Sequence, residues 1–380
     1  MLNGELFDPF KQVMNHLTVK PDPVVTDNWI FFLHRKWSFI VVLASLIFIA
    51  CRPVLLESPI ACLGPEEETI PKDFLEYYCW LHGTYIVPEY INARIGIDIP
   101  FPGIGPDLPS TTRVYQLHYL YYPFIILLQF FLFRASKYLW KYLEGERLRH
   151  LLSELTTAII DDATLKKRLF MVADYMTSFT TFHTTYAYRY LLCELFNIAS
   201  LILQIYLINS ILHGEFLGFG ITGMRYITSL STPTGNPPQK VEDPFTKLFP
   251  KVTMCKVEVS SPGGNLIIHE ALCVMPLNNV AEKIFLFMWF WLLFIGVVSG
   301  AGAIYRVAVV SSKKVRYGLL RLKVRKSLCP PKKLEYLVDN FSYGDWFVFS
   351  LIQKNTDPWV FARLVDELVD KMEELKGKDE

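Results

Sequence analysis

A run of 20 uncharged residues at 114–133, VYQLHYLYYPFIILLQFFLF, is the feature that most constrains this chain. A bilayer core about 30 Å thick is crossed by a helix of about 20 apolar residues. Comparable runs at 190–212 and 284–305 give the pattern of a polytopic membrane protein. Charged residues make up only 20% of the chain, which fits this class because soluble domains average about 25%.

The first predicted span, at 28–51, is less regular. Its uncharged part, 37–51, is 15 residues long, which is short for a crossing, and the extension to residue 28 includes His34, Arg35 and Lys36. Charged side chains in a span usually face water or protein rather than lipid. Two interpretations stay open: these residues mark the cytoplasmic end of the helix, or they face a pore.

The distribution of Lys and Arg orients the spans. The segments 1–36, 134–189 and 306–380 hold 28 of these residues, whereas 52–113 and 213–283 hold 10. The positive-inside rule therefore predicts that both termini are cytoplasmic. The two outer segments hold 15 Asp and Glu; they form either an acidic vestibule that enriches cations or an ordinary solvated surface.

The predicted organisation follows from these assignments. In chain order it is a cytoplasmic N-terminal helix (1–27), transmembrane span one (28–51), extracellular loop one (52–113), span two (114–133), a cytoplasmic loop (134–189), span three (190–212), extracellular loop two (213–283), span four (284–305) and a cytoplasmic C-terminal region (306–380). The C-terminal region begins with a basic segment, which we expect to contact anionic lipid rather than nucleic acid.

Several residues within the predicted spans invite specific interpretations. Pro123 is expected to kink span two, as a hinge or as a static bend. Gly296 and Gly300 form a G-x-x-x-G pattern, which predicts a helix-packing face in span four. Glu194 is the internal acid of span three, and we expect it to pair with a polar neighbour near the cytoplasmic interface.

Four cysteines lie in the predicted outer loops: Cys62 and Cys79 in the first, Cys255 and Cys273 in the second. Disulfides persist outside the cell, and four cysteines allow three pairings. A metal site is disfavoured because the chain lacks the short C-x-x-C spacing of zinc ligands. Pairing within a loop would close each loop on itself, whereas pairing between loops would join them into one cap.

Motifs of enzymes are missing from the sequence. The glycines of GFGITG at 218–223 have the G-x-G-x-x-G spacing, but they follow a membrane span and face outside, where a dinucleotide fold has no place. We therefore predict neither an enzyme nor a bound cofactor.

The residues also carry a family resemblance. The segments DFLEYYCWLHGTYIVP (73–88), DPFTKLFPKVTMC (243–255), HEALCVMPLNNVAEKIFLFMWFW (269–291) and GDWFVFSLIQKNTDP (344–358) resemble the innexins, the gap-junction proteins of invertebrates. The similarity runs in order through nearly the whole chain, and pannexins are related to the same family.

This resemblance implies an architecture and a function. The fold is expected to be an all-α membrane protein, a bundle of four transmembrane helices with two disulfide-linked extracellular loops and a helical cytoplasmic domain. Six or eight identical or mixed innexin subunits are expected to form a hemichannel that docks with one in the adjacent cell at a plasma-membrane gap junction. The family pairing implies Cys62–Cys273 and Cys79–Cys255, a nested arrangement.

The resemblance also implies that the N-terminal segment folds into the pore. Leu2, Leu6, Phe10, Val13 and Leu17 recur at helical spacing and predict an amphipathic helix. The expected pore-lining residues are Asn3, Glu5, Asp8, Gln12 and Asn15, together with His34 and Arg35. The alternative is a helix lying on the inner leaflet.

Two other functions stay open beside an intercellular channel that passes ions and small metabolites. One is an undocked, pannexin-like hemichannel that releases ions and metabolites, and the other is a structural adhesion protein of the cell junction. Transfer of dye or current between apposed cells distinguishes the three.

Overall fold

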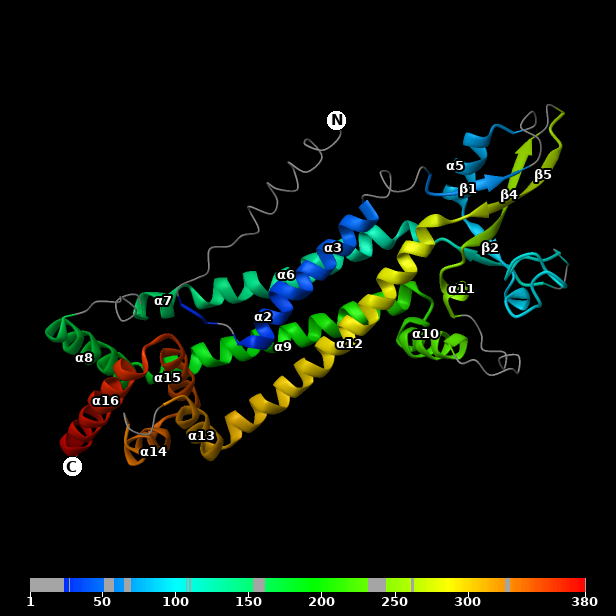
Figure 1. Ribbon diagram of the computed structural model, residues 1–380. Coiled ribbons are helices and arrows are strands. Elements are labelled where there is room, and N and C mark those ends of the chain that lie inside the picture. Colours follow the sequence, from blue (N-terminus) through cyan, green and yellow to red (C-terminus); the bar gives the residue numbers. More distant parts are fainter. Residues whose placement is uncertain are drawn as a thin grey trace, which may run out of the picture. The chain divides into compact units, whose positions relative to one another are not determined.

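The computed structural model describes residues 24–26, 28–50, 58–64, 70–106, 108, 111–152, 161–231, 244–260, 263–324 and 329–379 (Figure 1). These residues form two compact units. One unit, here called the helical unit, combines Tyr138–Leu195, Ala301–Glu380 and the segment that ends at Phe31. The second combines Phe32–Lys137 with Phe196–Gly300.

Three helical stretches among the described residues are long and apolar enough to cross a membrane: Trp29–Ile49, Thr180–Ile211 and Pro276–Ser311. The first comprises α2 (Trp29–Phe32), a π-helical turn η1 (Leu33–Ser38) and α3 (Phe39–Ala50). The other two are α9 (Thr180–Ile211) and α12 (Pro276–Ser311). Both continue beyond the predicted spans, because the polar residues at their ends keep helical hydrogen bonding.

The predicted span at 114–133 needs correction. Its helix, α6, begins at Tyr122 and ends at Glu144. The residues before it form strand β3 (Val114–Gln116) and a 3₁₀ turn, η3 (His118–Leu120). The second half of α6 contains Arg134, Lys137, Lys141 and Glu144, which lowers its hydropathy, so α6 does not join the three candidate spans.

The start of α6 also corrects the interpretation of Pro123. This residue is the second of the helix, where a proline lacks only an N–H that has no helical partner. It therefore favours helix initiation and does not kink the helix interior.

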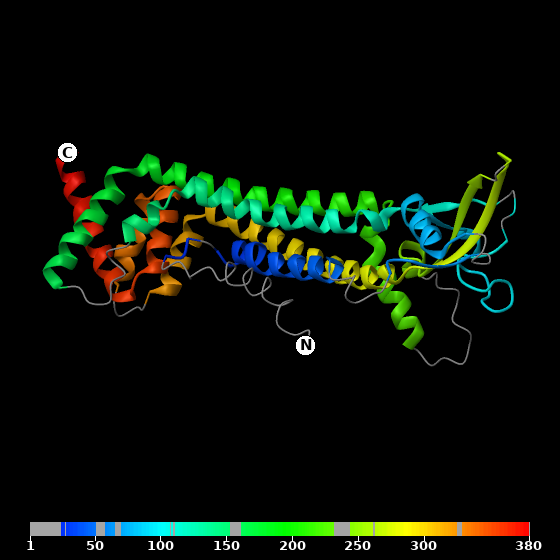
Figure 2. The ribbon, with the colours of Figure 1, turned by 90° about the horizontal axis from the view of Figure 1, so that it is seen from above.

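The helices of the second unit pack in parallel or antiparallel directions around a shared apolar core. In Figures 1 and 2, α3 lies beside the first half of α6, and the corresponding parts of α9 and α12 run alongside. Phe39 stacks against Phe130 with 4.8 Å between ring centroids, and Trp291 Nε1 donates to Ser38 Oγ at 3.3 Å. Val42, Ile126, Leu201 and Ile295 are buried in this core.

A five-stranded antiparallel sheet contradicts the prediction of an all-α fold, although the chain is mostly helical. The strands are β1 (Ala61–Leu63), β2 (Thr84–Ile86), β3, β4 (Val252–Ser260) and β5 (Leu266–Val274). Their order is β1-β5-β4-β2-β3. Helix α5 (Lys72–His82) and the 3₁₀ turn η2 (Pro88–Tyr90) complete this region. We call the sheet together with α5 the cap.

The glycine-rich segment 218–223 lies in helix α10 (Phe216–Ser231), which precedes the short helix α11 (Pro244–Leu248). A Cβ at Gly220 would collide with the Trp289 ring, and one at Gly223 would be 3.0 Å from Phe245. The glycine spacing therefore serves helix packing. A dinucleotide site requires a strand directly before the glycines, whereas here helix α9 comes directly before α10.

Six further helices lie among the described residues of the helical unit. They are α7 (Arg147–Leu152), α8 (Asp162–Ser178), α13 (Lys313–Lys323), α14 (Pro331–Asn340), α15 (Tyr343–Asn355) and α16 (Pro358–Asp379). Local sequence sets their boundaries: Ser312 caps α13, and Ser342 with Asp345 forms a capping box at α15. Their apolar faces bury Leu169, Leu337, Phe349 and Val365 in one core.

Candidate functional site

The cap joins two segments that are far apart in sequence. Strands β1, β2 and β3 come from the segment 52–113 and its junction with α6, whereas β4 and β5 come from 213–283. Strand β5 pairs with β1, and β4 pairs with β2. The main-chain hydrogen bonds of one sheet therefore hold the two predicted loops together.

Two disulfides link the same segments. Cys62 on β1 is bonded to Cys273 on β5, its direct partner in the strand register. Cys79 on α5 is bonded to Cys255 on β4. This is the nested pairing implied by the family resemblance, and all four cysteines are buried. The sulfurs of Cys62, Cys79 and Cys273 lie within 4.8 Å of one another, but the disulfides leave no thiolate there to hold a metal.

Hydrogen bonds attach the cap to the helices of its own unit. Tyr119, buried just before α6, donates its hydroxyl to the carbonyl of Trp80 on α5 at 2.9 Å. His118 Nε2 lies 2.8 Å from the Leu248 carbonyl. On α12, Asn278 Nδ2 donates to the Pro250 carbonyl at 2.8 Å. The cap is thus fixed directly to the starts of α6 and α12.

The far end of the β4–β5 hairpin exposes apolar side chains. Leu266, Ile267 and Ile268 are 63%, 44% and 53% exposed, next to the last residue pair, Ser260 with Leu266. Contiguous exposed apolar residues typically mark an interaction surface. We call these three residues the hairpin tip.

A polar network in the helical unit contains the acid of predicted span three. Glu194 on α9 accepts hydrogen bonds from Arg306 of α12 at 2.8 and 2.6 Å, and from Asn28 Nδ2 at 2.7 Å. The Asn28 main chain also donates to Tyr190 at 3.1 Å. Glu194 therefore has the polar partner that the sequence predicted, and the network links α9, α12 and the segment before α2.

The candidate pore residues divide into those that the structure describes and those that it does not. Asn3, Glu5, Asp8, Gln12 and Asn15 lie outside the described residues. His34 is buried, with Nε2 2.6 Å from Ser299 Oγ on α12. His34 thus contacts α12 within the subunit and Arg35 is partly exposed, and a pore-facing role stays a prediction for both.

Gly296 and Gly300 make no close backbone approach among the described residues, and their packing face stays a prediction. A Cβ at Gly296 would lie 3.9 Å from Leu201, an ordinary contact, and one at Gly300 would meet nothing within 4 Å among the described residues. The close approach occurs at Gly302, where a Cβ would collide with the Ile30 side chain. A small residue therefore permits close packing two positions beyond Gly300.

Sequence reasoning missed several residues that build these regions. Arg306, Tyr119 and Asn278 were given no part in these contacts. Each contacts a residue at least 28 positions away. The alternation of β4, VTMCKVEVS, was a readable signal for the sheet.

Apolar helices of membrane-spanning length, together with a disulfide-linked cap, define the chain as an integral membrane protein of the polytopic class. The sequence matches the innexin family over residues 27–372. It is 34% identical to innexin inx2 of Schistocerca americana, over 97% of this chain and 99% of that protein. Identity is also 34% to innexin inx2 of Drosophila melanogaster (97% and 96% covered) and 30% to its innexin shaking-B (97% and 95%).

The chain belongs to the innexin family. Innexins are gap-junction channel proteins, so the chain is a gap-junction channel subunit and not an enzyme.

Proposed function

We propose that this subunit assembles with other innexin subunits into a hemichannel that docks, through its cap, with a hemichannel of the adjacent cell. The docked pair passes ions and small metabolites between the cells. In this proposal α6 crosses the membrane as span two, in addition to the three candidate spans. Both termini are cytoplasmic, and six or eight subunits surround the pore. Counting subunits in images of the purified assembly tests the stoichiometry.

The observation that carries the proposal is the single sheet built from both predicted loops and joined by two buried disulfides. Docking of two surfaces is weakened when loops must be ordered at the moment of contact. A sheet that is already cross-linked removes most of that cost. The exposed hairpin tip gives such a rigid cap an apolar surface to bury.

The decisive experiment measures junctional and single-cell currents separately. We expect wild-type protein, expressed in paired cells, to give junctional current and dye transfer. Ile268→Asp at the hairpin tip should reduce junctional current at least about tenfold, because a charge buried in an apolar interface is strongly unfavourable. Hemichannel currents in single cells should persist, because the substitution is remote from the helices.

A matched control places the same charge on an exposed apolar residue outside the cap. Leu322 on α13 is 83% exposed, and Leu322→Asp should leave junctional current unchanged. Single-cell current without junctional current in the wild type would favour the undocked hemichannel. Absence of both junctional and single-cell currents in the wild type, with cell clustering present, would favour the adhesion role.

A further inference from the structure

A cavity of about 550 Å³ lies within the helical unit. It is bounded by α7, α8, the start of α9 and Val348 of α15. Cavities of about 300–1,000 Å³ are typical of sites for small organic ligands. The cavity therefore has the capacity of a ligand site, and its lining decides which ligand chemistry fits.

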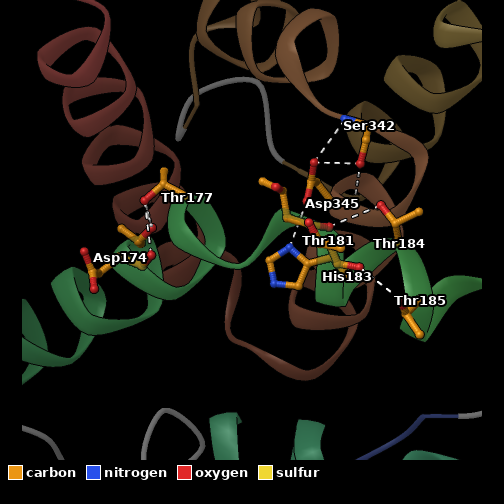
Figure 3. Close-up of polar contacts among 10 residues, drawn as sticks. Asp174, Thr177, Thr181, His183, Thr184, Thr185, Ser342 and Asp345 are labelled. Atoms are coloured by element: carbon orange, nitrogen blue, oxygen red, sulfur yellow. Dashed lines mark hydrogen bonds and ion pairs between the residues drawn. The ribbon is translucent and has the colours of Figure 1, made fainter. Parts of the chain in front are cut away.

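One wall of the cavity is a buried histidine with a free nitrogen. His183 on α9 is 1% exposed, and its Nδ1 lies 2.8 Å from Asp345 Oδ1 (Figure 3). Its Nε2 has no hydrogen-bond partner among the described residues. A buried polar atom without a partner is costly, and a bound ligand with a polar group would satisfy it.

The neighbours of His183 determine which nitrogen is free. Asp345 Oδ2 accepts from the Ser342 main chain at 3.1 Å and from its hydroxyl at 2.7 Å (Figure 3). Gly344 holds this turn against α9, because a Cβ there would collide with the Thr184 backbone. The fixed carboxylate of Asp345 accepts a hydrogen bond from Nδ1–H of His183, which leaves Nε2 for another partner.

The charged side chain in the described cavity lining, Arg147, is basic, which favours an anion. Arg147 and His150 of α7 line it and are exposed, so they lie at its opening. No carboxylate is among the described lining residues. Two acids are close in sequence. Glu144 accepts from the main-chain N–H groups of Glu146 and Leu148 at 2.7 and 3.0 Å and from the hydroxyl of the lining residue Tyr186 at 3.5 Å, and Glu146 pairs with Arg149 at 3.8 Å. Burial raises the pKa of Tyr175 in the cavity wall, while Arg147 acts in the opposite direction.

The remaining lining is aromatic and aliphatic. Phe179 and Phe182 are in contact with each other, with ring centroids 5.8 Å apart, and the Tyr175 ring lies 5.0 Å from the His183 ring. Such walls bind an apolar body, not a hydrated ion. The occupant must therefore combine an apolar body with one acidic group.

We propose that this cavity binds a small amphipathic carboxylic acid. Its acyl or aryl body packs against Phe179 and Phe182, and its carboxyl group shares a proton with His183 Nε2 while Arg147 attracts the negative charge. The proposal concerns binding only and does not depend on the docked or undocked use of the channel.

The test uses the full-length protein in nanodiscs and three photoreactive probes. Each carries a diazirine on a twelve-carbon chain, and they differ only in the head group: carboxylic acid, primary alcohol or primary amine. After irradiation, labelled peptides are mapped by mass spectrometry. We expect the acid to label residues 147–151 and 175–186 at least about tenfold more than the amine, and untagged dodecanoic acid to compete.

Matched variants separate the cavity from the surrounding bilayer. Arg147→Gln should weaken labelling by the acid several-fold, whereas Arg149→Gln, on the same helix but outside the lining, should not. Val348→Phe, which fills the cavity, should abolish labelling of both segments. Because Arg147 is exposed, its variant is expected to fold even if the Val348 variant does not.

Three results would overturn the proposal. The first is equal labelling by the acid and the amine, and the second is equal loss in the Arg147 and Arg149 variants. The third is labelling by the acid probe that is confined to the membrane spans, which would show that the cavity binds no probe in the assembled protein. Each can be read from the same peptide maps.

Discussion

The cap and the helical unit are held together by different means. In the cap, strands of three residues contribute little buried surface by themselves, and two disulfides join segments 211 and 176 residues apart. The helical unit buries a large apolar core without a disulfide between its described residues. Burial also raises the pKa of its Cys329 to about 11, with Asp366 adding to the effect, so this thiol stays protonated and unreactive.

The two regions are therefore stabilised by different interactions. Small β-rich regions in oxidising compartments often depend on disulfides because their cores are small. Helical regions depend instead on packing, close backbone approaches and helix caps. Four sets of substitutions test this contrast, from the largest expected loss of stability to the smallest.

Removing a cap disulfide should have the largest effect. Cys79→Ala combined with Cys255→Ala deletes one bridge without leaving a free thiol, and the expected loss is about 2–5 kcal/mol. Thermal unfolding and non-reducing peptide mapping measure it. As the matched change in the helical unit, Cys329→Ala should cost about 1 kcal/mol. Equal losses in the two regions would refute the contrast.

The closest backbone approach of the helical unit should come next. Gly344→Ala forces α15 away from Thr184 of α9, which should cost about 1–3 kcal/mol by overpacking. Gly318→Ala on α13 is the control, because nothing lies within 4 Å of its added Cβ. That control should be neutral or stabilising by up to about 1 kcal/mol. Similar melting temperatures for both variants would show that the contact at Gly344 relaxes freely.

The capping box of α15 should contribute less. Ser342→Ala removes the acceptor for the Asp345 main-chain N–H and should cost about 1 kcal/mol. Ser350 is in the same helix, where its hydroxyl only donates to the Phe347 carbonyl. Ser350→Ala should therefore leave the unfolding temperature nearly unchanged. A larger loss for Ser350 than for Ser342 would contradict the role of the cap.

Surface ion pairs of the helical unit should contribute least. Arg363 on α16 pairs with Asp162 on α8 and lies over the Trp359 ring, and both charged groups are solvent-exposed. A double-mutant cycle with Arg363→Gln and Asp162→Asn should give a coupling of about 0.2–1 kcal/mol. It should shrink at high salt. A coupling above the loss at Gly344 would overturn the proposed order.

Long apolar runs made two of the helices predictable from sequence, and the family resemblance supplied the disulfide pairing. The sheet was missed because β1, β2 and β3 have only three residues each, too few for a period-two pattern. The start of α6 was missed because the uncharged run continues through β3 into the helix. Tyrosine and histidine are tolerated in either conformation there.

Contacts between distant residues were the least predictable part. His183 and Asp345 are 162 residues apart, so no local pattern connects them, although the capping box at Ser342 was readable by itself. The same holds for the pairing of Glu194 with Arg306, 112 residues apart. The sequence suggested that Glu194 needs a partner but not which residue provides it.

Each of the nested disulfides can form only after the second of its two cysteines has been synthesised. Cys62 and Cys79 leave the ribosome long before Cys255 and Cys273, and at about 5–20 residues per second the interval lasts roughly 10–40 seconds. During that time the two early thiols, 17 positions apart in the chain, can pair with each other before their final partners exist. A bond between Cys62 and Cys79 formed in that interval would have to be reduced or rearranged before the nested pairing could form.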